Sequence, residues 1–284
     1  MRRIRHRSAD LLPVGGRLVQ RADAQALINI AQFTWITEIG MGGGRLAITG
    51  VLPIGTLDVS GRGSVELPDG SEIDRKVSDG VTGFGDPAVG ASLGWKNRSG
   101  DRFRAWSVYG SAFIPIGDYQ LGRIANLGKN RWALDVGGAF TMANFARGRE
   151  FSSVLGFTFN GDNLDTDYSS GTDMHLELAG KQHLPRHWAF GVVGYWYEQL
   201  TGDSNNSPRL GDFKGRVFGI GPEVSYQFTS SERHPVSLDF RWYHEFGAEN
   251  RMEGDAVFLT ISVPIFNPAA REKAQDWSAE AGQQ

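Results

Sequence analysis

Ionisable side chains fall only on the odd positions of DMHLELAGKQH, residues 173–183. Successive side chains of a β-strand point to opposite faces, so such a strand carries charge on one face and aliphatic carbon on the other. A charged face of this kind can tune the passage of solutes, or it can pair across strands and close the interior of a barrel. The candidate residues of this strand are Asp173, His175, Glu177, Lys181 and His183.

Two further segments, 131–142 and 235–247, alternate between polar and apolar residues in the same way. We expect their polar faces to share one interior with the first strand. Because buried charges need partners, ion pairing inside the interior is favoured over a solute constriction. The further interior candidates are Asp135, Asp239, Arg241, Tyr243 and Glu245, and the aromatic residues Tyr195, Trp196 and Tyr197 could receive an aromatic solute near the loop end of another strand.

Motifs for catalysis and for cofactor binding fail in their context. GASLG (90–94) matches the nucleophile elbow, but Ser92 falls inside an expected strand, whereas the elbow needs a strand-to-helix turn. GRIANLGKN (122–130) resembles a phosphate loop with one residue too many and without Ser or Thr after the lysine. The six histidines show no metal-ligand spacing. The sequence therefore predicts no enzyme, no catalytic residue, no metal site and no cofactor.

Composition points to a β-protein rich in glycine. The chain has 284 residues with 38 glycines, no cysteine and a net charge of −3. The near-neutral charge gives no electrostatic reason to bind nucleic acid. The absence of cysteine excludes disulfides, thiolate metal sites and thiol catalysis. Since no run of 18 apolar residues occurs, no transmembrane helix is expected.

Period-two segments recur along the chain and predict about eleven strands. Their connections alternate strictly between short turns and long polar loops such as 55–86 and 115–130. In an up-and-down sheet this places all short turns at one end, as in outer-membrane barrels. The expected strands are 24–37, 45–54, 87–97, 102–114, 131–145, 150–160, 172–183, 187–200, 213–228, 235–247 and 255–266.

Three regions follow from this pattern. Residues 1–16 are expected to be irregular, residues 17–266 to form one all-β antiparallel barrel, and residues 267–284 to be a polar tail. The apolar strand faces would lie in lipid and the polar faces in the lumen. Aromatic residues near strand ends, such as Trp95, Trp132 and Phe246, suit the membrane interfaces.

Several long stretches resemble one family, the outer-membrane proteins of the MetA pathway of phenol degradation. They include GDPAVGASLGW (85–95), FIPIGDYQLGRIANLGKNRWALDVGGAFT (113–141) and HEFGAENRMEGDAVFLTISVPIF (244–266). The similarity covers most of the chain from about residue 17. It implies an outer-membrane β-barrel, a transporter-like protein that admits hydrophobic or aromatic compounds, and it brings no catalytic residue set.

The start of the chain departs from that family, whose members begin with a signal peptide and one further strand. Here the opening residues are basic and lack the apolar stretch of a secretory signal. Bacterial single-chain barrels have even strand numbers. We therefore expect about twelve strands, the first of them missing because the start is placed too late or the gene is truncated.

Three functions remain open. The favoured one is uptake of small hydrophobic or aromatic solutes such as phenolics across the bacterial outer membrane, by a barrel in contact with lipid and lipopolysaccharide. The alternative is a structural or surface barrel with a plugged lumen and no flux. A barrel enzyme acting on lipids is the least favoured and would need a Ser–His pair on the outer face.

Overall fold

The computed structural model describes residues 2–11, 17–66, 72–185, 187–204, 214–228 and 236–265. Every regular element among these residues is a β-strand, and none of them forms a helix that could cross a bilayer. The thirteen described strands are β1 (Arg2–Leu11), β2 (Arg17–Met41), β3 (Gly44–Glu66), β4 (Glu72–Phe84), β5 (Ala88–Ser99), β6 (Arg102–Phe113), β7 (Ala133–Asn144), β8 (Arg149–Asn160), β9 (Asp173–His183), β10 (Trp188–Gln199), β11 (Arg216–Phe228), β12 (Val236–Glu249) and β13 (Glu253–Ser262).

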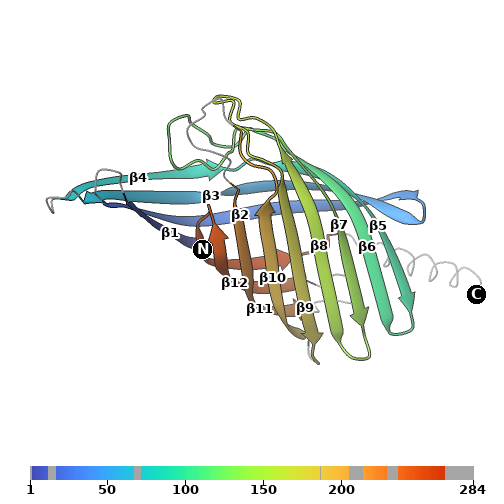
Figure 1. Ribbon diagram of the computed structural model, residues 1–284. Helices are drawn as coiled ribbons and strands as arrows, with labels where there is room; N and C mark the ends of the chain where they lie inside the picture. The colour runs from blue at the N-terminus through green and yellow to red at the C-terminus, as the bar shows by residue number, and fades with distance from the viewer. Residues whose placement is uncertain are drawn as a thin grey trace, which may run out of the picture.

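All described strands except β4 pair in an antiparallel ring (Figure 1). Strands β5 to β13 follow one another in chain order, β3 pairs with β5, and β2 lies between β3 and β1. β1 completes the ring because residues 2–5 pair with residues 253–256 of β13. The ring therefore contains twelve of the thirteen described strands. This confirms the expected all-β, up-and-down barrel.

The start of the chain differs from the sequence prediction. Residues 2–11 are not irregular but form β1, which takes the place of the strand that we expected to be missing. β1 pairs along its whole length with residues 17–26 of β2. Strand pairing uses backbone groups, so a basic sequence without alternation can still join the sheet. The expected polar tail at 267–284 lies outside the described residues.

Two strands of the ring are about twice as long as the rest. β2 has 25 residues and β3 has 23, against 12 in β5 and β6. At about 3.4 Å per residue, β2 extends roughly 85 Å. Figure 1 shows the far halves of β2 and β3 leaving the barrel beside β1 and β4. We call this four-stranded extension, residues 2–11, 17–26, 56–66 and 72–84, the arm.

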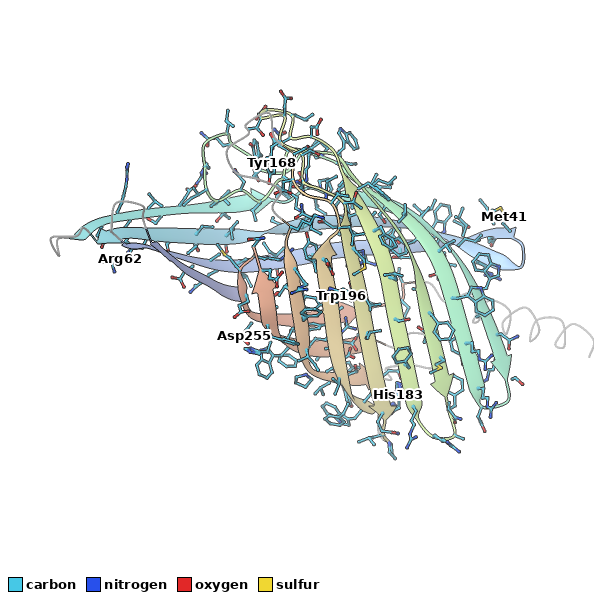
Figure 2. The ribbon with its side chains drawn as sticks, viewed as in Figure 1. Met41, Arg62, Tyr168, His183, Trp196 and Asp255 are labelled. Atoms are coloured by element: carbon cyan, nitrogen blue, oxygen red, sulfur yellow. The ribbon has the colours of Figure 1, made fainter. Side chains whose placement is uncertain are left out.

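The arm corrects the expectation of a long polar loop at 55–86. Residues 56–66 of β3 instead pair with residues 72–82 of β4. An ion pair between Arg62 and Asp74 joins these two strands, with Arg62 toward the far end of the arm in Figure 2. Glycine and aspartate, which are depleted in strands, make this segment resemble a loop in composition.

The remaining strands, β5 to β13, each overlap one of the strands expected from the sequence. The short turns between them contain glycines in the left-handed region, including Gly100 with φ of 57° and Gly148 with φ of 60°. Glycine adopts this conformation without steric cost, which permits the tight reversal between adjacent strands. These glycine-containing turns lie at one end of the ring, called here the turn end. The other end, where the three-residue connection 250–252 between β12 and β13 lies, is called the loop end.

Candidate functional site

The polar face of β9 points into the ring. Lys181 on β9 contacts Glu223 on β11, with Nζ and Oε1 3.0 Å apart, although β10 lies between these strands. A side chain reaches past a neighbouring strand in this way on the concave side of a curved sheet. The opposite face is apolar and open, since Val192 of β10 is 57% exposed and Ile220 of β11 is 52% exposed.

The ten charged or phenolic residues that the alternation assigned to a shared interior all lie on this inner face. Their register and their mutual contacts place them there. They are Asp135 on β7, Asp173, His175, Glu177, Lys181 and His183 on β9, and Asp239, Arg241, Tyr243 and Glu245 on β12.

The three neighbouring aromatics of β10 divide between the two faces. Tyr195 and Tyr197 point inward, where their hydroxyls donate to Glu245 and Asp173. Trp196 faces outward, and its ring stacks on Phe218 with the centroids 5.8 Å apart. Trp196 therefore does not join the two tyrosines as part of an interior path, which corrects the expectation for it. Figure 2 labels Trp196 on the wall of the barrel.

One interior cluster crosses four strands toward the loop end of the barrel. Nε2 of His175 on β9 lies 3.1 Å from Oδ1 of Asp135 on β7 and 3.5 Å from the hydroxyl of Tyr109 on β6. Gly137 and Gly156 occupy the row between Tyr109 and His175. Because these positions carry no side chain, the long side chains on either side can meet above them.

Substituting Gly156 with alanine is expected to lower the free energy of unfolding by about 1–3 kcal/mol, the usual cost of overpacking. An added Cβ would overlap with both the Tyr109 hydroxyl and the His175 ring. Urea titration of the refolded barrel would measure the change. Gly180→Ala on β9 is the control, since nothing lies within 4 Å of its added Cβ. An equal loss of stability in both variants would contradict the role of Gly156 beneath the contact between Tyr109 and His175.

A second interior cluster lies closer to the turn end and is built around Glu223, which is 1% exposed. Its Oε1 accepts from Nε of Arg241 at 2.7 Å and lies 3.0 Å from Nζ of Lys181. Lys181 also lies 3.8 Å from Asp239. Gly191 of β10 sits beneath this contact, and its added Cβ would be 3.1 Å from Cγ of Lys181. The cluster joins β9, β11 and β12.

A third crossing uses a tyrosine. The Tyr195 hydroxyl on β10 donates to Glu245 on β12, and Gly219 of β11 lies between them. An added Cβ on Gly219 would overlap with the Tyr195 ring. Glu245 is 2% exposed, so the hydroxyl supplies a hydrogen bond that a buried carboxylate needs. Charges and hydroxyls thus join the interior wall from β6 to β12.

Residues 114–132, the cap loop, connect β6 to β7 at the loop end and are held by acidic side chains. Asp86 accepts from the backbone N–H of Gly117 at 3.0 Å and of Lys129 at 2.6 Å. Asp118 accepts from the N–H of Phe84 at 2.5 Å. Both stems of the loop are therefore fixed to the end of β4 and the start of β5.

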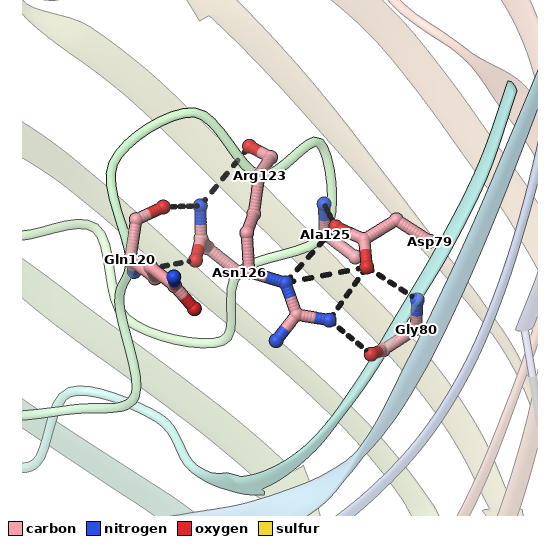
Figure 3. A network of polar contacts seen from close by, with 6 residues as sticks. All are labelled: Asp79, Gly80, Gln120, Arg123, Ala125 and Asn126. Carbon is pink, nitrogen blue, oxygen red and sulfur yellow. Dashed lines mark hydrogen bonds and ion pairs between the residues drawn. The ribbon is translucent and has the colours of Figure 1, made fainter.

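A salt bridge fixes the tip of the cap loop to the arm (Figure 3). Nε of Arg123 lies 3.2 Å and 3.1 Å from the two carboxylate oxygens of Asp79 on β4. The same carboxylate accepts from the N–H of Ala125 at 3.1 Å. The Arg123 guanidinium holds the pKa of the Asp79 carboxyl well below its usual range. The charged form of Asp79 is therefore the one that fixes the tip.

A second loop, 161–172, packs on the cap loop. Nδ2 of Asn163 donates to the carbonyl of Lys129 at 3.0 Å, and the N–H of Leu164 donates to Asn130 at 2.9 Å. Tyr168, near the top of Figure 2, donates to Asp203 of the next loop. Burial and this carboxylate raise the pKa of Tyr168 to about 12, so its hydroxyl stays protonated as a donor.

A cavity of about 530 Å³ lies beneath the cap loop. Residues of β2 and β3 line one side of it, and residues of β7 to β10 line the other. Ile28, Ile54, Phe113 and Leu127 form its apolar part. Its polar part consists of Asp86, Lys129, Arg131, Asp135, Thr158, Asn160, Asp173, His175 and Tyr197.

Sequence reasoning missed the interior partners Tyr109 and Glu223 and the cavity residue Lys129. Tyr109 and Glu223 become visible once the register aligns Tyr109 with His175 and Glu223 with Lys181 across intervening glycines. Lys129 belongs to the stretch that was set aside as an imperfect phosphate loop, and no local pattern placed its side chain inside the barrel.

Comparisons with known proteins agree with this architecture. Residues 12–261 match the family described as the MetA-pathway of phenol degradation. A crystal structure of an outer membrane channel from Pseudomonas putida F1 has the same fold, with a TM-score of 0.55 and 14% sequence identity. That similarity covers 92% of this chain and 91% of the channel. None of the curated proteins matches the chain.

Proposed function

The chain belongs to the MetA-pathway family of phenol degradation, and on this premise we propose that it is an outer-membrane channel for the uptake of small hydrophobic or aromatic compounds such as phenolics. The barrel fold that it shares with an outer membrane channel supports this proposal. The observation that carries it is the interior cavity, where an apolar surface large enough for an aromatic ring lies inside an otherwise polar lumen.

In this proposal the barrel lies in the bacterial outer membrane with the cap loop outside the cell. Its apolar outer face contacts phospholipid and lipopolysaccharide. The stacked Trp95–Trp106 pair, with centroids 6.4 Å apart near the turn end, suits the aromatic belt at a membrane interface. Phospholipid and lipopolysaccharide obstruct hydrophobic solutes, so an interior path would lower the barrier to uptake. No nucleic-acid partner is proposed.

Flux into liposomes tests the proposal. Liposomes that hold the refolded barrel should admit phenol-sized aromatics faster than empty liposomes, and faster than they admit a sugar of similar size. Substituting Asp173 or Arg241 should change the aromatic rate, since both face the lumen. The folded state of the barrel is checked by its gel mobility before and after heating. A folded barrel that admits neither solute would contradict the proposal.

A plugged structural barrel is the second candidate, and the interior ion pairs favour it. Glu223 pairs with both Lys181 and Arg241, and the cap loop is fixed at both stems and at its tip. This candidate expects no flux of either solute from the folded protein. The same liposome experiment therefore separates the two.

A lipid-acting barrel enzyme has less support. It needs a histidine on the outer face within reach of a serine hydroxyl. His244 lies on that face, but its Nδ1 is 3.1 Å from Asp255, and Nε1 of Trp242 donates to the same carboxylate oxygen. Continued hydrolysis of lipid after His244→Ala would dismiss this residue as the base.

A further inference from the structure

The carboxylates that line the cavity beneath the cap loop already accept hydrogen bonds from other groups of the protein. Asp86 accepts from two backbone N–H groups, of Gly117 and of Lys129. Oδ1 of Asp135 accepts from the Thr158 hydroxyl at 3.1 Å and lies 3.1 Å from His175. The three carboxylates of the cavity thus hold protein donors, since Asp173 accepts from Asn160 at 2.9 Å and from Tyr197 at 2.7 Å.

The two cations of the cavity are not satisfied in the same way. The ammonium group of Lys129 opens onto the cavity and makes no hydrogen bond or ion pair with the part of the chain that the structure describes. Arg131 donates to the Ser170 hydroxyl, but its Nε is buried without an acceptor among the described residues. The cavity therefore has hydrogen-bond donors without acceptors, and few of its acceptors are free.

The side chain of Lys129 keeps contact with solvent in the cavity. The surrounding protein nevertheless lowers the pKa of its ammonium group by desolvation. The nearby charges of Arg131 and Arg251 lower it further, while Asp173 and Asp86 oppose the change. An anion placed beside Lys129 would stabilise the charged form of the lysine.

We propose that the cavity is a binding site for an amphipathic organic anion, whose carboxylate accepts from Lys129 and Arg131 while its hydrocarbon body lies against Ile28, Ile54 and Phe113. The inference rests on the proposed function, because it names the class of solute that the lumen selects. A hydrophobic amine is disfavoured by the two cations, and a neutral alcohol leaves the positive charges uncompensated.

Calorimetric titration of the refolded protein in nonionic micelles tests the site without requiring flux. The probes are 4-phenylbutanoate, 4-phenylbutan-1-ol and 4-phenylbutylamine, which share one hydrocarbon body, and protein-free micelles give the background. The carboxylate is expected to bind at least about tenfold more tightly than the alcohol, as charge-assisted hydrogen bonds are the stronger kind. Equal affinities for the three probes would overturn the inference.

Variants of Lys129 locate the effect. Lys129→Met is expected to reduce affinity for the carboxylate to that for the alcohol, whereas Lys129→Arg should retain it. The control is Lys96→Met on β5, a lysine that does not line the cavity. If Lys129→Met binds the carboxylate as tightly as the unaltered protein does, the site is not where we place it.

The pH dependence gives an independent readout. With lysine at position 129, carboxylate affinity should fall as pH rises through the lowered pKa of Lys129, and with arginine it should persist. The two proposals can fail separately. Binding of the carboxylate without liposome flux would support the anion site and contradict the channel. Aromatic flux without preference for the carboxylate would support the channel and contradict the anion site.

Discussion

Replacing Glu223 with alanine is expected to lower the free energy of unfolding of the barrel by about 3 kcal/mol. Breaking a buried ion pair costs roughly 3–5 kcal/mol because the partner charges stay behind without compensation. Glu223 is 1% exposed and serves two cations, Lys181 and Arg241. We expect the lower end of the range, since the Arg241 side chain is 37% exposed and Lys181 keeps Asp239 at 3.8 Å.

The measurement is urea unfolding in micelles. A second measurement is the temperature at which the band of the folded protein on a gel converts to that of the unfolded protein. Glu249→Ala is the matched control, because Glu249 also pairs with an arginine, Arg216, but its side chain is 61% exposed. Exposed pairs contribute about 0–1 kcal/mol. If both alanine variants lose the same stability, the interior cluster does not anchor β9, β11 and β12.

Replacing Asp86 with alanine is expected to raise the ion conductance of the barrel severalfold. The carboxylate of Asp86 holds the N–H groups of Gly117 and Lys129, so both stems of the cap loop lose a charge-assisted hydrogen bond together. Leu127, Lys129 and Arg131 of that loop line the cavity in the lumen. A released loop should therefore widen the passage between the walls of the barrel.

Single-channel recording in planar bilayers measures this effect. Asp101→Ala, in the turn between β5 and β6, removes a carboxylate far from the cap loop and should leave conductance unchanged. An unchanged conductance in Asp86→Ala would mean that Asp118 and the Asp79–Arg123 pair hold the loop without it. Adding Asp79→Ala to Asp86→Ala would then distinguish a redundant attachment from a loop that does not block the lumen.

The attachment of the cap loop through Asp79 should also persist in mild acid. Because the folded-state pKa of Asp79 is depressed, its contribution is present above the ordinary value of 3.8 and is lost only as pH falls through the lower, folded value. Conductance limited by this attachment should thus stay constant between about pH 7 and about pH 4. A rise within that range would contradict the role of Asp79. Arg123→Gln removes the ion pair itself and should therefore raise the conductance at every pH in the range.

The sequence predicted the inner face well where one face of a strand is polar and the other apolar. In 173–183 and 235–247 the period of two is local information, and every ionisable candidate there lies inside. β10 is different, because its inner face also carries apolar residues such as Val193, which is 2% exposed. Alternation places Trp196 on the opposite face from Tyr195 and Tyr197, but it cannot tell which of these faces is the inner one, which the register with β11 settles.

The arm and the interior partnerships depend on pairings that single segments do not encode. Residues 56–66 alternate between polar residues at even positions and aliphatic residues or glycine at odd ones, but their glycines and Asp58 favour a loop until β4 pairs with them. Glu223 has no local mark of its role, which arises from Lys181 in a strand two positions away in the sheet. Such contacts need the order and register of several strands, which are properties of the whole barrel.

The glycines beneath the crossing side chains have a consequence for evolution. Lys181 can reach Glu223 only while position 191 has no side chain, and Tyr195 can reach Glu245 only while position 219 has none. Each glycine and the long residue above it should therefore be inherited as one unit. Among divergent relatives we expect larger residues at 191 to accompany shorter ones at 181, and a lineage that changes one position alone should pass through a less stable intermediate.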